Sequence, residues 1–194
     1  IADYGFDFID EGDENLVWLI ENCYKRKMIL QLHFGTFRNV NAKMYEMCGK
    51  DSGFDIMRGT IDTDALVKIF DRENMRLGGL PKIVVYPLND YDLRALGALT
   101  GAFPQVKLGA AWWFNDTVSG IKRQMETAAE YSALGTQYGM LTDSRSFSSY
   151  VRFDFYRRIL SSFIGERVEN GEYDEAAAIA RKIAYENIKN ALAV

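Results

Sequence analysis

Several features that mark particular protein classes are scarce or missing in this sequence. The chain has two cysteines, Cys23 and Cys48, which lie far apart and form no CxxC pair, so neither a disulfide framework nor a thiolate metal site is expected. No apolar run approaches the ~20 residues that a membrane span needs, and no signal peptide is visible. The net charge is −4 and no run of like charges occurs, which gives no reason to expect nucleic acid as a partner. These absences predict a cytoplasmic protein that binds neither nucleic acid nor a membrane.

Two kinds of ligand site are also poorly supported. Glycine-rich phosphate loops of the GxGxxG or Walker type are absent, so nucleotide binding is not expected. His33 is the only histidine of the chain. A zinc site needs three or four ligands, and one histidine with one well-placed aspartate leaves such a site incomplete.

What the sequence does contain is typical of one globular α/β domain over residues 1–194, with 48% apolar and 26% charged residues. Residues 1–12 read as a loop. Apolar runs predict strands over 28–34, 82–86, 106–114 and 137–142. Helical periodicity and capping residues predict helices over 14–26, 62–77, 90–100, 116–134, 148–164 and 173–193, with Asp62 as one cap and Asn115 or Asp116 as another.

The order of these elements predicts a parallel sheet, because helices separate the strands and parallel strands need such crossovers. Four strand–helix units followed by an extra helix amount to half of an eight-fold (β/α) barrel. A small doubly wound sheet is the alternative. The polar stretch 39–52 is longer than a plain connection and is interpreted as a functional loop.

Unusual polar and aromatic residues fall at the C-terminal ends of the predicted strands. His33 ends one strand, Trp112 another, and Asp143 and Arg145 share one face at the end of a third. In a barrel these ends converge on one mouth, where catalytic residues lie. The alternatives are a structural histidine, tryptophans that pack in the core or rim, and Asp143 as the N-cap of the next helix. Arg38, just past a strand end, suits an anion clamp or is a surface residue.

Three motifs resemble those of the uronate (glucuronate) isomerase family, part of the metal-dependent amidohydrolase superfamily of (β/α)₈ barrels. They are Gln31-Leu-His-Phe-Gly-Thr-Phe-Arg-Asn39, Gly109-Ala-Ala-Trp-Trp-Phe-Asn-Asp116 and Leu141-Thr-Asp-Ser-Arg-Ser-Phe147. The resemblance covers nearly the whole chain in the family's order and continues through Tyr156-Arg-Arg-Ile-Leu160 and Ala180-Arg-Lys-Ile-Ala-Tyr185. It implies the C-terminal half of the barrel, strands five to eight with their helices and an extra C-terminal helix, without the N-terminal half.

The resemblance also implies an activity and a set of roles. The family interconverts D-glucuronate with D-fructuronate, and D-galacturonate with D-tagaturonate, by proton transfer through an enediol. Asp143 corresponds to an aspartate that binds the divalent metal, expected to be zinc, and takes part in proton transfer. Arg145 corresponds to a substrate-contacting arginine and His33 to the histidine of the fifth strand, and both are expected to be catalytic together with Asp143. Arg38 corresponds to the arginine that follows this histidine and Trp112 to a tryptophan of the pocket, and both are expected to bind substrate. The family's His-x-His metal ligands have no counterpart here.

Three hypotheses remain open from the sequence. The first is an isomerase fragment, an intramolecular oxidoreductase that acts on a small uronate sugar, forms a homo-oligomer and has little activity by itself. The second is another metal-dependent hydrolase of the superfamily, which would usually have a second histidine at the next strand end. The third is a non-catalytic half-barrel that binds a partner or an acidic sugar, since a half-barrel has two open sheet edges.

Overall fold

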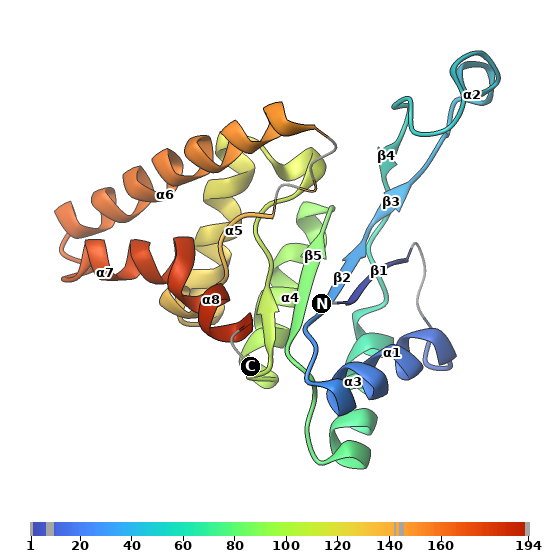
Figure 1. Ribbon diagram of the computed structural model, residues 1–194, viewed down its shortest axis with the longest axis horizontal. Helices are drawn as coiled ribbons and strands as arrows, with labels where there is room; N and C mark the ends of the chain where they lie inside the picture. Colours follow the sequence, from blue (N-terminus) through green and yellow to red (C-terminus); the bar gives the residue numbers. More distant parts are fainter. Residues whose placement is uncertain (1, 7–9, 142, 144–145, 193–194) are drawn as a thin grey trace.

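The computed structural model describes residues 2–6, 10–141, 143 and 146–192 (Figure 1). Its main sheet has four parallel strands in the order β1-β2-β5-β6, and β3 and β4 form a separate antiparallel pair. The strands are β1 (Ala2–Phe6), β2 (Leu30–Phe34), β3 (Thr36–Phe37), β4 (Ile56–Met57), β5 (Ile83–Pro87) and β6 (Val106–Leu108). The α-helices are α1 (Glu14–Arg26), α2 (Ala42–Cys48), α3 (Thr63–Leu77), α4 (Asp90–Ala102), α5 (Val118–Tyr131), α6 (Val151–Glu169), α7 (Ala176–Arg181) and α8 (Asn187–Leu192).

Short helical turns complete the chain. They are η1 (Trp113–Asn115), η2 (Leu134–Thr136), η3 (Phe147–Tyr150) and the π-helical η4 (Lys182–Glu186), which joins α7 to α8. In the part of the chain that the structure describes, no helix has the length and apolar character needed to cross a membrane.

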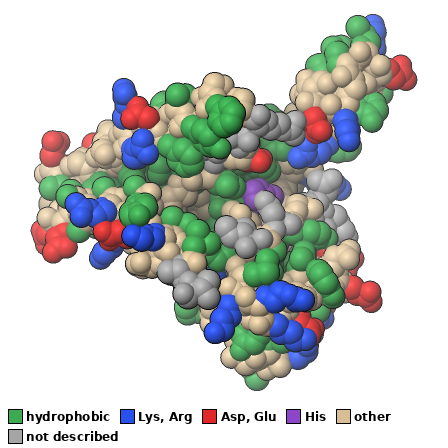
Figure 2. Space-filling view, viewed as in Figure 1, with side chains coloured by type: hydrophobic (Ala, Val, Ile, Leu, Met, Phe, Trp, Pro, Cys, Tyr) green, Lys and Arg blue, Asp and Glu red, His purple; other side chains and the backbone are tan. Residues whose placement is uncertain are grey.

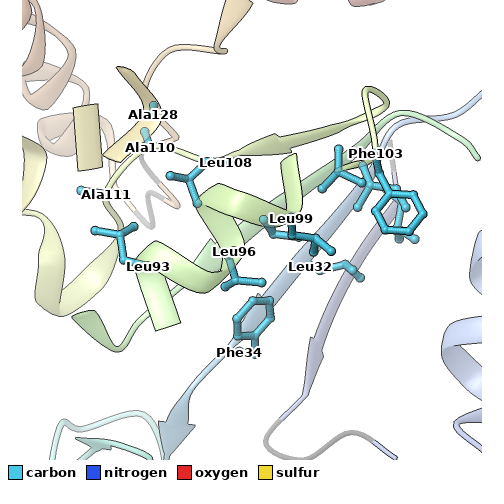
Figure 3. Close-up of a cluster of buried hydrophobic side chains, with 14 of the residues drawn as sticks. Leu32, Phe34, Leu93, Leu96, Leu99, Phe103, Leu108, Ala110, Ala111 and Ala128 are labelled. Atoms are coloured by element: carbon cyan, nitrogen blue, oxygen red, sulfur yellow. The ribbon is translucent and has the colours of Figure 1, made fainter. Parts of the chain in front are cut away.

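The main core lies on one face of the sheet. Leu30, Leu32 and Phe34 of β2 and their counterparts on β5 and β6 face this side and are buried under α1, α3, α4, α5 and α6. Figure 3 shows Leu96 and Leu99 of α4 next to Phe34 and Leu32 of β2. Each fully buried leucine of this kind contributes roughly 1.5–3 kcal/mol to folding.

The opposite face of the sheet, called here the inner face, carries a smaller apolar cluster. Its buried members are Ile29, Val84, Tyr86, Leu88 and Trp112, and the apolar side chains of α8 pack on them. The larger helices therefore gather on the other side, which is the arrangement of a (β/α) barrel wall and not of a doubly wound sheet. The predicted half-barrel of parallel strands is confirmed, and the doubly wound alternative is wrong.

Two segments differ from the prediction: one expected loop is an edge strand of the sheet, and one expected strand is not formed. Ala2–Phe6 was expected to be a loop but pairs in parallel with β2, and Ala2 and Tyr4 pack on the core. Its aspartate and glycine have low strand propensity, which masked the alternating pattern. Residues 137–141 form no strand: the side-chain amide of Asn187 donates to the carbonyl oxygens of Gly135 and Gln137, at 2.8 Å each. Thr142 lies outside the described residues.

Smaller differences concern element ends. The third predicted strand stops at Leu108, and its continuation turns into η1. Thr117, and not Asn115 or Asp116, caps α5 by accepting from the backbone N–H of Gly120. The caps of α1 and α3, Asp13 and Asp62, each accept a backbone N–H in their first turn as expected of such residues.

The stretch after β2 forms a projecting unit of residues 36–57, called here the arm. It comprises β3, α2 and β4, with α2 at its tip, and it extends away from the body of the molecule (Figure 1). The helix α2 has no buried residue. The predicted functional loop 39–52 is therefore part of an ordered arm, which carries residues to the site described next.

Candidate active site

A cavity of about 390 Å³ lies where the arm meets the C-terminal ends of the strands. Its lining combines arginines, carboxylates and aromatic rings from three regions of the chain. The lining residues are Arg38, Asp51, Gly53, Phe54, Asp55, Trp112, Trp113, Phe114, Asp143 and Arg152. In Figure 2 the single histidine of the chain, in purple, is visible near the centre of this face, below the arm, and it is not one of the lining residues. Three of the predicted site residues thus meet at one cavity.

Trp112 connects two of the predicted residues. It follows β6, is 7% exposed, and its ring makes an edge contact with the ring of His33, with centroids 4.6 Å apart. Its indole Nε1 donates a hydrogen bond of 3.2 Å to Oδ2 of Asp143. A carboxylate held by a neighbouring donor has a defined orientation, so Trp112 presents the Asp143 side chain at the cavity.

His33 lies on the inner face at the end of β2 and is 8% exposed. Its ring stacks on that of Tyr86, its partner on β5, with centroids 4.7 Å apart and planes 20° apart. Gly109 makes room for this stack, since a Cβ at that position would lie 2.2 Å from the Tyr86 ring. The first glycine of the Gly109–Asp116 motif therefore has a steric role.

Arg38 enters the cavity from the arm. Its guanidinium carbon lies 4.9 Å from the centroid of the Trp113 ring, and its Nη1 contacts Oδ1 of Asp51 at 3.4 Å. Trp113 in turn stacks on Phe114, with centroids 5.4 Å apart and planes 6° apart. An arginine over an aromatic face next to open space is well placed to bind a carboxylate beside a sugar ring.

Four cavity residues other than glycine have left-handed backbone conformations, which only glycine adopts readily. The φ angle is 60° at Asp51, 65° at Phe54, 51° at Trp113 and 43° at Asp143. Aspartate tolerates this region better than a bulky tryptophan does. Such strain persists where the surroundings determine the conformation, and it is concentrated at functional sites.

Arg152 is a cavity residue that the sequence did not reveal. It lies in the first turn of α6 and forms an ion pair with Asp116, whose side chain is 7% exposed. Within a helical pattern an arginine of this kind cannot be distinguished from a surface residue. The same holds for Asp51 and Asp55, although the polar composition of 39–52 did indicate a functional segment.

The remaining predictions for the site have different outcomes. Asp143 is not the N-cap of the next helix, because α6 begins at Val151 after Tyr150, with no side-chain cap. Arg145 lies outside the described residues, so its predicted contact with substrate stays a prediction.

The residues present do not complete a metal centre. Among the described side chains, no group of three or more His, Cys, Asp or Glu is placed to hold a metal ion. Asp143 is a suitable carboxylate ligand, but zinc in proteins is held by at least three side chains. The described part of this chain therefore does not supply a complete set of ligands.

A family model described as glucuronate isomerase matches residues 13–192. The uronate isomerase of Serratia proteamaculans is 38% identical over 189 residues, which covers 92% of this chain and 40% of that protein. The uronate isomerase of Staphylococcus haemolyticus is 41% identical over 182 residues, with 86% of this chain and 38% of that protein covered.

Solved structures give the same result. The uronate isomerase of Thermotoga maritima has a TM-score of 0.85 and 30% identity, covering 92% of this chain and 40% of that one. The glucuronate isomerase of Caulobacter crescentus has a TM-score of 0.82 and 30% identity, covering 91% and 37%. The chain thus spans about two fifths of the length of these relatives. Over that span the fold and the sequence agree, and the chain belongs to the glucuronate isomerase family.

Proposed function

We propose that this chain is the C-terminal part of a uronate isomerase, which interconverts D-glucuronate with D-fructuronate and D-galacturonate with D-tagaturonate. The observation that carries the proposal is the Asp143 carboxylate, oriented by Trp112 at a cavity that also contains Arg38. The names of the relatives supply the substrate class, and their greater length supports assignment of this chain to part of the enzyme.

The reaction moves a carbonyl group from C1 to C2 of the open-chain sugar. In the proposed sequence Asp143 takes the proton from C2, the electron pair forms the C1–C2 double bond, and negative charge develops on O1. The proton then returns to C1, while the O2 hydroxyl proton is transferred to O1 and a carbonyl forms at C2. A positioned carboxylate suits this task, because the same group accepts and returns the proton.

Substrate binding is assigned to the cationic and aromatic side of the cavity. Arg38 binds the uronate carboxylate or the enediolate oxygens, since a guanidinium offers two parallel donors to a carboxylate. Arg145 is proposed as the second substrate-contacting arginine. Trp112 forms the wall beside the sugar and His33 lies behind it, at 4.6 Å between ring centroids. Holding the sugar in one orientation lowers the entropic cost of the proton transfer.

A divalent metal, zinc by family resemblance, is part of the proposal with Asp143 as one ligand. When bound, such an ion would stabilise the negative charge that develops on the sugar oxygens. Because the described residues do not complete the site, the roles given above are those of this chain's own side chains.

The proposal is tested by assaying isomerisation of both uronates with this chain alone and with the full-length gene product, each with added zinc. Activity in the longer protein and little or none in this chain is expected. The variant Asp143→Asn of the full-length protein should lose nearly all turnover and keep its thermal unfolding profile. Asp154→Asn is the matched control, because this carboxylate on α6 forms an exposed ion pair with Arg158 at 2.8 Å and does not line the cavity. An inactive wild-type protein would refute the proposed function.

Assembly and location remain predictions. Exposed apolar side chains on the arm, among them Tyr45, Met47 and Ile56, support assembly into a homo-oligomer. The mass of the full-length protein measured by light scattering tests it. Cys23 and Cys48 are free thiols, which supports a reducing compartment such as the cytoplasm.

A further inference from the structure

The arm is attached to the body through the first turn of α4. The side-chain amide of Asn89 donates to the carbonyl oxygen of Arg58 at 2.8 Å, and Oδ1 of Asp92 accepts from the backbone N–H of Ile61 at 3.1 Å. Asn89 is 6% exposed and Asp92 is 2% exposed. Two buried side chains of α4 thus hold the segment that follows β4.

Asn89 makes its contact in addition to capping α4, whereas Asp92 makes its contact in place of a capping interaction. Asn89 is the N-cap of α4, and its Oδ1 also accepts from the N–H of Tyr91. Asp92 occupies the third helical position, where an acidic side chain often turns back to the N-cap. Here it turns outward to Ile61, and its second oxygen is buried with no hydrogen-bond partner among the described residues. Burial raises the pKa of Asp92 to about 6, which means that the ionised side chain lowers the free energy of unfolding.

The arm itself is a short ribbon with a helix at its tip. Its ribbon has two residue pairs, Thr36 with Met57 and Phe37 with Ile56, and α2 buries no side chain. Inside the arm the N–H of Asn39 donates to Oδ1 of Asp55 at 2.7 Å. These contacts give the arm its own shape. Its position relative to the body depends on the segment 58–61 that Asn89 and Asp92 hold, called here the base of the arm.

The base of the arm also determines where Arg38 lies relative to the cavity. The N–H of Arg58 donates to the carbonyl oxygen of Gly35 at 2.8 Å, so the outgoing and returning segments are joined next to Asn89. Beyond this junction the arm brings Arg38 to 4.9 Å from the centroid of Trp113. A small rotation at the base would therefore displace the Arg38 guanidinium from the cavity.

We propose that Asn89 and Asp92 are positioning residues for substrate binding, which act by fixing the arm so that Arg38 stays over Trp113. This inference rests on the proposed isomerase function. Asn89 and Asp92 contact the segment that directly follows the arm, at Arg58 and Ile61, and not the substrate. Their loss should therefore weaken substrate binding more than it slows the chemical step.

The test uses the full-length gene product with D-glucuronate as substrate. Asp92→Ala removes the acceptor for Ile61 and should raise KM about tenfold, the equivalent of one lost buried hydrogen bond, with kcat close to wild type. Asp92→Asn keeps an oxygen acceptor and should restore KM. Asp90→Ala is the matched control: it removes an acid from the same turn, which pairs with Arg123 at 2.8 Å and does not touch the arm.

A double-mutant cycle shows whether the effect passes through Arg38. In an Arg38→Ala background, Asp92→Ala should raise KM little further, because the displaced group is already missing. An unchanged KM in Asp92→Ala, or an equal rise in both backgrounds, would overturn the inference. If Asp92→Ala does not fold, Asn89→Ser carries the same test, because serine keeps an N-cap and loses the reach to Arg58.

Amide hydrogen exchange gives a readout that does not depend on activity. In Asp92→Ala, residues 36–57 should exchange faster while β2 and β5 stay as protected as in the wild type. Unchanged exchange in the arm contradicts the inference even if the enzyme is active. If Asp92→Ala exchanges faster in the arm but the wild-type protein shows no isomerase activity, the arm is held as described and the proposed function has failed.

Discussion

The hydrogen bond from Trp112 to Asp143 offers the most direct test of the candidate site. Trp112→Phe removes the indole N–H, which lies 3.2 Å from Oδ2 of Asp143, and keeps an aromatic ring beside His33. The Asp143 carboxylate then loses the donor that orients it. Because Asp143 is exposed, the released side chain should sample other orientations.

The magnitude follows from the kind of bond that is lost. A hydrogen bond to a charged group contributes about 1.5–3 kcal/mol where it is shielded from water. Asp143 is exposed and the bond is at the long end of the usual range, so the lower figure applies. A loss of about 1.5 kcal/mol corresponds to roughly a tenfold fall in kcat/KM.

The assay is the initial rate of D-glucuronate isomerisation by the full-length gene product. Trp18→Phe is the control for the substitution itself, since Trp18 is 63% exposed on α1, away from the cavity. Thermal unfolding of both variants shows whether the fold is kept. A rate for Trp112→Phe equal to that of wild type, or an equal loss in Trp18→Phe, would refute the orienting role of this bond.

Three further predictions concern the same full-length protein. Gly109→Ala should lower the free energy of unfolding by about 1–3 kcal/mol and reduce activity, because its methyl group would displace the Tyr86 ring stacked on His33. Gly135→Ala is the control, because its methyl group would meet open space, and it should change neither the thermal unfolding nor the rate. Burial raises the pKa of Asp92 from 3.8 to about 6 in the folded state, so its ionisation destabilises the fold increasingly as pH rises from about 4 to 6 and by a constant amount above. Asp92→Asn should therefore be more stable than wild type at pH 8, by at most about 3 kcal/mol, and should lose this advantage near pH 4, whereas a gap independent of pH in denaturation curves would contradict the shift. Arg38→Lys should raise KM with little change in kcat, because an ammonium group neither stacks on Trp113 nor binds a carboxylate bidentately; an unchanged KM would remove Arg38 from the binding role.

Elements with strong local signals were predictable from the sequence. The helix Glu14–Arg26 has an apolar stripe and an aspartate cap, and the helix that follows Asp62 ends at Gly78 in the left-handed conformation, as the sequence indicates. The buried strand β5 is a continuous apolar run, and β2 has large apolar side chains at alternate positions. These features depend on side chains within a few residues of one another, and hence a single stretch of sequence contains the information. The motifs around His33, Trp112 and Asp143 also identified the family, and each of the three supplies a residue that lines the cavity.

The tertiary structure decided the features that depend on distant partners. A strand exists only where a neighbour offers hydrogen bonds, which is why Ala2–Phe6 is a strand and residues 137–141 are not. The contact between Trp112 and Asp143 and that between Arg38 and Trp113 each join residues that no local pattern relates. The same is true of Asp92, which looks like an ordinary first-turn acid until Ile61 is seen beside it. Local chemistry determines the elements and the kinds of residue at their ends, whereas the distances that make these residues a site arise only when the chain packs.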